Sequence, residues 1–219
     1  MQERQKREKR IWQRLAKNYD KQVKVYEQAY NISIQKILKF LNQDSEVLDI
    51  ACGTGIVSLG LAKYVKQIIA IDLSEKMIKV AKNKTIEKKI TNIEFKVADA
   101  YQLNYPENSF DIILLFNTLH IVQEPVSVLN KIYNLLKPSG KLIIATDCYA
   151  EPVSGGVKVQ LGIQKVFNKI GLIPFLSFYK KSEIDTMIAN CGYEIIEKDD
   201  LHKNPINYYL ALKKKIVKN

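Results

Sequence analysis

The sequence predicts an α/β fold in which helices cover both faces of a seven-stranded, mostly parallel sheet. Short apolar runs alternate with amphipathic stretches from residue 46 to residue 147, which is the rhythm of strands joined by helical crossovers. One run, SFDIILLFN, is apolar along nearly its whole length, as expected for a strand buried on both faces. Two last runs, YEIIEKD and INYYLALKK, are joined too closely for a crossover, so they should form a terminal antiparallel hairpin.

The expected elements follow one another in a simple order. Strands are expected at 46–50, 67–72, 92–99, 109–117, 141–147, 193–199 and 206–214. Helices are expected at 11–41 in two pieces, at 55–64, 74–82 and 126–136, and from 182 up to a stop at Gly192. Ser74 should cap the helix that follows it, and Ser182 with Asp185 should form a capping box for the last helix.

The net charge of +11 lies at the two ends of the chain. Residues 1–40 carry 11 basic and 4 acidic side chains, residues 198–219 carry 6 and 2, and the segment between them is balanced. Basic ends can meet phosphate on a nucleic acid or on an anionic membrane surface. We favour the plainer interpretation, a solvated helix face and a Lys-rich tail, because charge runs are usually solvated.

Several protein classes are disfavoured by what the sequence lacks. No apolar run reaches the roughly 20 residues of a membrane span, and no apolar segment follows the charged start as in a secretory signal. The cysteines Cys52, Cys148 and Cys191 are scattered, and no Cys or His pair has zinc-ligand spacing. The sequence therefore predicts a reduced, cytoplasmic protein with no metal and no transmembrane segment.

A corner of small residues marks the expected ligand site. In EVLDIACGTGIVSLGLAKYV an apolar strand turns sharply into a helix and presents bare backbone N–H groups. In a parallel sheet this corner lies at the carboxyl end of a strand, where ligands collect. The next strand ends in Asp72, where a carboxylate can accept both hydroxyls of a ribose. The site is therefore expected to bind a nucleoside.

Two common nucleotide sites do not fit this corner. A dinucleotide motif that starts at Gly53 would need a third glycine where Ser58 stands. No Gly-Lys-Ser/Thr follows the corner, so it is not a P-loop.

Four segments together resemble the class I S-adenosylmethionine-dependent methyltransferases. They are VLDIACGTG, IIAIDLSEKMIKVAK, VADAYQLNYPENSFDIILLFNTLHIV and LLKPSGKLIIA, in the order that this family has them. Ala51 departs from the pattern, since many members carry glycine there. The resemblance implies a Rossmann-like fold with S-adenosyl-L-methionine as cofactor.

The resemblance also implies a role for each matching residue. Asp49 would hold the methionine end of the cofactor near its ammonium group. The backbone of Ala51, Gly53 and Gly55 would pass under the cofactor, and Asp72 would take the ribose hydroxyls. Leu73 and Met77 would contact the adenine, Asp99 would accept its amine, Ala100 would offer a backbone N–H, and Asn117 would lie beside the sulfonium.

The chain is expected to be one methyltransferase domain, 1–219, with four parts. Residues 1–42 would form an N-terminal helical arm, 43–147 the cofactor-binding core, 148–181 a substrate lid insertion, and 182–219 the C-terminal helix and strands. The acceptor pocket should lie between the arm and the insertion. Tyr19 and Tyr149 are the candidate substrate contacts, and Tyr19 is also a candidate catalytic residue because the N-terminal helix closes over the cofactor in similar small-molecule enzymes.

His120 is the candidate general base, three residues beyond Asn117. A loop histidine that only hydrogen-bonds explains the same pattern. A base is needed only when the acceptor must lose a proton, because in-line methyl transfer mainly requires alignment in a water-poor site.

Three functions remain open at this point. The first is methyl transfer to a small-molecule acceptor, with a lipid head-group methyltransferase as a variant in which the basic arm makes a weak peripheral contact with an anionic membrane. The second is an RNA or protein methyltransferase. It is disfavoured because FNTLH stands where base-methylating enzymes carry Asn/Asp-Pro-Pro-aromatic, and because no Pro-Cys nucleophile is present. The third is a non-catalytic nucleoside-binding protein.

Overall fold

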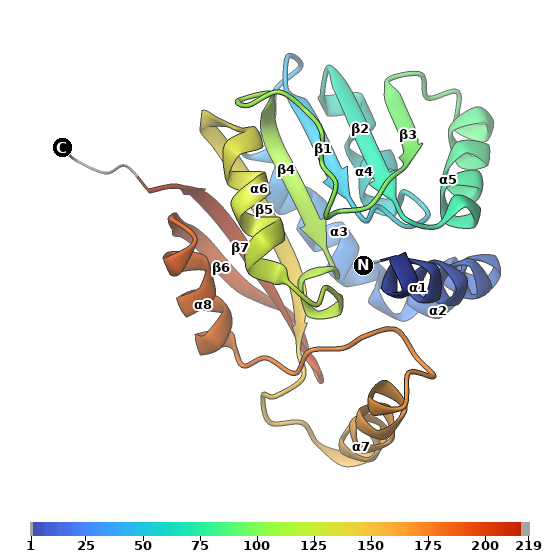
Figure 1. Cartoon of the computed structure of the whole chain (residues 1–219). Helices are drawn as coiled ribbons and strands as arrows, with labels where there is room; N and C mark the ends of the chain where they lie inside the picture. The colour runs from blue at the N-terminus through green and yellow to red at the C-terminus, as the bar shows by residue number, and fades with distance from the viewer. Residues whose placement is uncertain (1, 216–219) are drawn as a thin grey trace.

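The computed structural model describes residues 2–215 and contains one seven-stranded sheet (Figure 1). The strand order is β3-β2-β1-β4-β5-β7-β6. The strands are β1 (Glu46–Ile50), β2 (Gln67–Asp72), β3 (Ile93–Val97), β4 (Phe110–Phe116), β5 (Leu136–Cys148), β6 (Tyr193–Lys203) and β7 (Ile206–Lys214). Strands β1 to β5 pair in parallel, whereas β7 pairs antiparallel with both β5 and β6. The mostly parallel sheet and the terminal hairpin that the sequence predicts are therefore confirmed.

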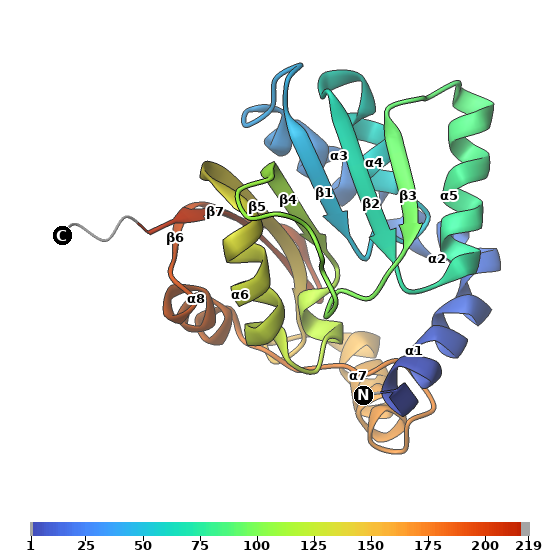
Figure 2. The same ribbon diagram turned by 45° about the horizontal axis from the view of Figure 1, so that its top comes forward.

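Helices lie on both faces of this sheet, and the N-terminal ones form a separate arm (Figures 1 and 2). The α-helices are α1 (Gln2–Leu15), α2 (Tyr19–Val23), α3 (Glu27–Leu38), α4 (Ile56–Leu61), α5 (Glu75–Lys88), α6 (Pro125–Leu135), α7 (Gly155–Lys169) and α8 (Lys181–Asn190). Short 3₁₀ turns are η1 (Ala16–Asn18), η2 (Lys24–Tyr26), η3 (Ala62–Tyr64) and η4 (Leu119–Ile121). None of the helices described between residues 2 and 215 could span a bilayer.

The sheet divides the core into two layers because successive strand residues point to opposite faces. On β4, Ile113 and Leu115 pack with α6 and α8, whereas Ile112 and Leu114 pack with α3, α4 and α5. All four side chains are essentially inaccessible to water. A strand with both faces covered must be apolar throughout, which is why the SFDIILLFN run could be assigned from the sequence.

The ligand site follows from how the chain crosses this sheet. After β1 the chain passes through α4 on one face and adds β2, whereas after β4 it passes through α6 on the other face and adds β5. The connections after β1 and β4 therefore diverge, and they leave a crevice at the carboxyl ends of these neighbouring strands.

Local details differ from the sequence-based expectations at several places. Helix α5 continues to Lys88 instead of ending near Lys82, and β6 continues to Lys203 instead of Asp199. The charged start is the helix α1 rather than a polar lead-in. Leu136 already pairs with Phe110 in the sheet, so the helix before it ends one residue earlier than expected. The predicted capping box of Ser182 with Asp185 is wrong, because α8 begins at Lys181 and the Lys180 N–H donates to the Glu183 carboxylate over 2.7 Å. The predicted Ser74 cap is confirmed by the bond from the Met77 N–H, at 3.3 Å.

The arm is fastened to the body by polar contacts close to the crevice. The Thr54 hydroxyl, on the glycine-rich turn, donates to Asp20 over 2.5 Å, and the Lys84 ammonium lies 2.6 Å from the other oxygen of that carboxylate. Farther out, Lys9 pairs with Glu75 at the start of α5, at 2.6 Å. These contacts hold α1 and α2 across the carboxyl edge of the sheet.

Candidate functional site

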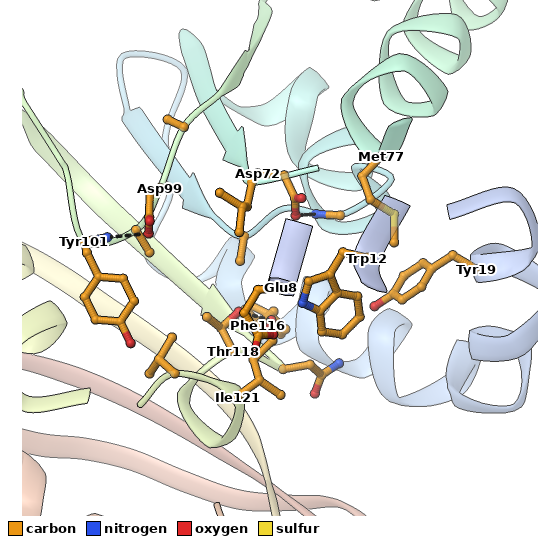
Figure 3. Close-up of a pocket in the computed structure, with 17 residues that line it drawn as sticks. Glu8, Trp12, Tyr19, Asp72, Met77, Asp99, Tyr101, Phe116, Thr118 and Ile121 are labelled. Atoms are coloured by element: carbon orange, nitrogen blue, oxygen red, sulfur yellow. Dashed lines mark hydrogen bonds between the residues drawn. The ribbon is translucent and has the colours of Figure 1, made fainter. Parts of the chain in front are cut away.

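A pocket of about 750 Å³, its mouth included, occupies the crevice and will be called the main pocket. Its walls combine the ends of β1, β2, β3 and β4 with the arm (Figure 3). It is lined by Glu8, Trp12, Tyr19, Ala51, Gly53, Asp72, Leu73, Met77, Ala98, Asp99, Ala100, Tyr101, Phe116, Asn117, Thr118, Ile121 and Val122.

The glycine-rich turn forms the floor under Tyr19. Ala51, Gly53 and Gly55 all have positive φ, at 57°, 55° and 78°, a conformation that side chains with a Cβ disfavour. A Cβ built on Gly53 would meet only the Tyr19 ring, at 3.6 Å, so the floor is bare backbone. Gly55 has a different task, since a Cβ there would lie 2.9 Å from the Phe95 ring. Gly55 therefore allows tight packing beneath the pocket and does not line it.

We expect Ala51→Gly to stabilise the protein by roughly 0.5–1 kcal/mol. Left-handed backbone costs an L-residue about 1–2 kcal/mol, and glycine removes that cost while adding back about 0.4–1 kcal/mol of unfolded-state entropy. Urea unfolding of the two proteins measures the difference. Ala100→Gly is the control in the same pocket, because its φ is not positive, and it should destabilise the protein. A destabilised Ala51→Gly protein would contradict this account of the turn.

Asp72, the last residue of β2, connects the glycine-rich turn after β1 to the end of β2 through hydrogen bonds. One of its carboxylate oxygens accepts the Gly53 N–H over 2.9 Å, and the other accepts the Ser74 N–H over 2.8 Å. Burial raises the pKa of Asp72 to about 6, although these two hydrogen bonds oppose the shift. The carboxylate is thus fixed in orientation and still lines the pocket.

Asp49, at the end of β1, is a buried carboxyl group with no cation beside it. It is 2% exposed, the Ser58 hydroxyl donates to it, and none of the described lysine or arginine side chains pairs with it. Burial raises its pKa to about 7, the Asp72 charge adds to the shift, and the Ser58 hydrogen bond opposes it. Asp49 borders a small cavity of about 330 Å³ that shares Tyr19, Ala51 and Gly53 with the main pocket.

The remaining predicted cofactor residues line the main pocket at its two ends. Figure 3 shows Asp99 and Tyr101 toward one end and Tyr19 with Met77 toward the other. Asp99 is 7% exposed and accepts the Tyr101 N–H over 3.0 Å. Leu73, Ala100 and Asn117 also line this pocket. Of the ten residues that the sequence predicts around the cofactor, only Asp49 and Gly55 lie outside the main pocket.

Asn117, just beyond β4, is the centre of a hydrogen-bond network. Its side-chain amide donates to the Tyr30 hydroxyl over 3.0 Å, and its carbonyl accepts from Asn207 over 2.9 Å. Asn207 also donates to Asp147 over 2.7 Å, and the Tyr149 hydroxyl donates to the other oxygen of Asp147 over 2.8 Å. The network joins the arm, β4, β5 and β7, so it fixes the amide that faces the main pocket.

A second cavity, the side pocket, lies beyond Asn117 and measures about 330 Å³. It shares Phe116 and Asn117 with the main pocket. Its lining residues are Tyr26, Ala29, Tyr30, Ser33, Phe116, Asn117, Ala145, Asp147, Leu201 and Asn207. Asp147 is therefore the acidic group of the side pocket.

The sequence analysis did not identify several residues that line these pockets, among them the polar or aromatic residues Glu8, Trp12, Tyr30, Asp147 and Asn207. A signal was present for two of them. Glu8 and Trp12 are four residues apart, and on a helix such a pair shares one face. The others come from elements far apart in sequence. Asp147 and Asn207 meet because β5 and β7 are neighbours, and Tyr30 joins them because α3 packs near the end of β4.

His120 and Tyr149 lie behind the site rather than in the lining of either pocket. His120 is buried, and its Nδ1 accepts the Asp147 N–H over 3.2 Å and lies 2.9 Å from the Thr146 hydroxyl. Burial lowers its pKa, whereas the Asp147 charge opposes this. Its Nε2 lies 4.0 Å from the Asp147 carboxylate, and its ring packs edge-on against Tyr149. The roles predicted for these two residues stay predictions.

The insertion meets the arm instead of entering the pocket. None of the residues described within 148–181 lines the main pocket. The Phe175 N–H donates to the Glu8 carboxylate over 3.4 Å, and the Ser177 N–H donates to the His120 carbonyl over 2.7 Å. The insertion thus supports the part of the arm that carries Glu8.

The fold and the site together define a class of protein, and comparisons with known proteins agree. Residues 48–144 match the family model described as a methyltransferase domain. The chain is 28% identical over 193 residues to the ubiquinone biosynthesis O-methyltransferase of Coxiella burnetii, which covers 83% of this chain and 80% of that protein. It is also 37% identical over 114 residues to the ubiquinone/menaquinone biosynthesis C-methyltransferase UbiE of Rickettsia akari. This alignment covers 49% of this chain and 46% of that protein.

A solved structure agrees with these relatives. A methyltransferase structure from Bacillus halodurans superimposes with a TM-score of 0.64 at 26% identity, over 76% of this chain and 71% of that chain. These matches and the fold show that the chain carries a class I S-adenosylmethionine-dependent methyltransferase domain, whose cofactor is S-adenosylmethionine. The residues present fit this group, because Asp49 is a buried carboxyl group that lacks a cation and the floor at Gly53 has no side chain.

Proposed function

We propose that this protein transfers a methyl group to a small, uncharged or cationic acceptor held under the N-terminal arm. One observation carries the proposal. Glu8 and Trp12 of the arm help to line a pocket in which none of the 17 lining residues is lysine, arginine or histidine. The side pocket also lacks these residue types among its described lining. An acceptor that carries phosphate would find no counter-charge there, although the chain as a whole carries +11.

The cofactor contacts in this proposal follow the positions of the lining residues. Asp49 holds the ammonium of the methionine end, and Asp72 accepts the ribose hydroxyls. Leu73 and Met77 contact the adenine, Asp99 accepts its amine, and the Ala100 N–H donates to it. The backbone of Ala51 and Gly53 runs under the cofactor, with Gly55 packing below them, and Asn117 lies beside the sulfonium.

The cofactor supplies an activated methyl group on a sulfonium, so the chain mainly has to position the acceptor and exclude water. Trp12 and Tyr19 cover the site from the arm. Asn117 cannot turn freely, because Tyr30 and Asn207 hold both ends of its amide. Alignment of this kind can supply roughly 7–11 kcal/mol of barrier reduction.

An acceptor that must lose a proton needs a base, and His120 is the candidate in this proposal. His120 does not line the side pocket, but Asp147 does, and the Asp147 carboxylate lies 4.0 Å from His120 Nε2. Because Nδ1 accepts the Asp147 N–H, the neutral ring carries its proton on Nε2, so a proton taken from an acceptor would have to reach Nδ1 in place of that N–H. Tyr149 orients Asp147 through its hydroxyl and is a positioning residue rather than a substrate contact in this arrangement.

Acceptor panels with radiolabelled S-adenosylmethionine test the proposal. The names of the relatives, which concern quinone biosynthesis, support including hydroquinones and catechols, and the acidic pockets support including amines. Transfer to at least one of these classes is the expected result. Transfer only to RNA, to protein or to phospholipid head groups would overturn it. No contact in the site favours those alternatives over a small molecule.

The proposed partner of Asp49 makes binding dependent on pH. A pKa of about 7 means that the free protein holds a proton on Asp49 below neutrality, whereas a bound ammonium favours the ionised carboxylate. Affinity for S-adenosylhomocysteine should therefore fall by about tenfold or more as the pH is lowered from about 8 to about 5.5. The stability of the free protein should change in the opposite sense, because a raised carboxyl pKa contributes stability that is lost as pH rises from about 4 to about 7.

Calorimetry across this pH range, with Asp49→Asn as the matched control, provides the measurement. The asparagine variant should bind more weakly at pH 8 and should show a flatter pH profile, with the remainder arising from Asp72. Equal slopes in the two proteins would assign the titration to another group and would remove Asp49 from the ammonium site.

A further inference from the structure

The insertion carries an apolar helix face that no described part of the chain covers. Six of the twelve large apolar side chains that are exposed in the described chain lie between residues 155 and 172, although this segment is a small part of the chain. Their exposed fractions range from 41% to 66%. They are Val159, Ile163, Val166, Phe167, Ile170 and Leu172, which will be called the α7 stripe.

The spacing of the stripe shows that it is a single face. From Val159 the apolar residues recur at i+4, i+7, i+8 and i+11, which places them on one side of a helix. Leu161 points the other way and is buried at 6% exposure, so α7 already docks through its opposite side. The stripe is therefore not the core-facing side of this helix. A contiguous exposed apolar patch of this kind more often marks an interaction surface than a surface without a function.

The charges around the stripe indicate what covers it. Segment 155–172 contains Lys158, Lys165 and Lys169, all exposed, and no acidic residue. The positively charged helix α1 lies beside its end, where a Cβ on Gly171 would be 3.2 Å from the Arg7 guanidinium. A second copy of this chain would bring the same lysines against one another, so the charges oppose self-association through this face. An apolar stripe flanked by lysines matches the surface of an anionic lipid bilayer.

We propose that α7 and the turn after it bind an anionic membrane surface. The α7 stripe enters the boundary between head groups and acyl chains, and Lys158, Lys165 and Lys169 meet the lipid phosphates. The proposal stands independently of the acceptor, since it concerns a surface outside both pockets. The proposed membrane-binding surface lies near the main pocket, because the insertion that carries it contacts Glu8, and Glu8 lines the main pocket. Docking would bring the roof of that pocket close to the lipid.

Flotation with lipid vesicles tests the proposal on the full-length protein. The protein should float with vesicles of phosphatidylcholine and phosphatidylglycerol, and much less with phosphatidylcholine alone or at high salt. Ile163→Asp with Ile170→Asp should reduce the bound fraction by about tenfold or more. Replacement of Lys158, Lys165 and Lys169 with glutamine should weaken binding by roughly fivefold for each lysine.

Ile86→Asp is the matched control, because Ile86 is 76% exposed on α5, outside the segment, and its replacement should leave flotation unchanged. Circular dichroism checks that each variant is folded. Three outcomes would overturn the proposal. The first is that the parent protein does not float with anionic vesicles. The second is that the stripe variant floats as well as the parent protein, which would assign binding to the basic arm. The third is a concentration-dependent dimer that the stripe variant abolishes.

Discussion

Replacement of Asp72 with alanine should weaken the binding of S-adenosylhomocysteine by about 10- to 100-fold and leave the protein folded. Hydrogen bonds to a charged group contribute roughly 1.5–3 kcal/mol, and each 1.4 kcal/mol is about tenfold in affinity. The fold should tolerate the change for two reasons. Gly53 lines the pocket, where water can replace the acceptor that its N–H loses, and a buried carboxylate with a raised pKa is removed. The buried Ser74 N–H also loses its acceptor, so a moderate loss of stability accompanies the change.

Calorimetry with thermal unfolding measures both parts of this expectation. Asp72→Asn should give an intermediate affinity, because the amide keeps one acceptor and loses the charge. Asp44→Ala is the control, since Asp44 is an exposed turn residue distant from the pocket, and it should bind as the parent protein does. An unchanged affinity in a folded Asp72→Ala protein would remove the ribose assignment.

Removal of residues 1–26 should abolish most of the methyl transfer, by about 100-fold or more, at a much smaller cost in stability. The truncation deletes Glu8, Trp12 and Tyr19, which cover the pocket, so water enters and alignment is lost. The cut leaves α3 intact, whose Ile37 is fully buried in the core, and also keeps Tyr30 with its bond to Asn117. The deleted segment contributes little to the core, because Ala16 is its one buried apolar residue among residues 2–26 with described side chains.

Initial rates with an acceptor from the panel and urea unfolding test this prediction. Trp12→Ala gives a second measurement that keeps the arm in place, and it should lower the rate without changing stability. Val25→Ala, at a site that is 70% exposed on the same arm, should change neither. A truncated protein that transfers methyl groups at the parent rate would show that the arm is not needed to cover the main pocket.

Patterns that depend on nearest neighbours could be predicted from the sequence. The succession of strands and helices along the chain followed from alternating apolar runs, and the site corner followed from Ala51, Gly53 and Gly55 between a strand and a helix. Asp72 could also be placed, because the residues at the ends of parallel strands must meet at one edge. These inferences required only local periodicity and the rules of sheet topology, whereas Leu73, Met77 and Asp99 were placed through the resemblance to known methyltransferases.

Contacts between distant segments could not be predicted in the same way. His120 looked like a pocket residue because it follows Asn117, but the turn of η4 directs it toward Thr146 and Asp147. Likewise, residues 148–181 were expected to form a substrate lid, yet none of the residues described there lines the main pocket, and the segment contacts the arm at Glu8.

The sequence by itself determined the sheet, the helical crossovers and the glycine-rich corner, because apolar period and backbone freedom are properties of short segments. Only the tertiary structure decided that Glu8 and Trp12 line the pocket, that Tyr30, Asn207 and Asp147 surround Asn117, and that the α7 stripe faces outward. The physical reason is that these contacts depend on how helices and strands far apart along the chain pack. In addition, the same apolar spacing on a helix suits burial against the protein and burial against a membrane equally well.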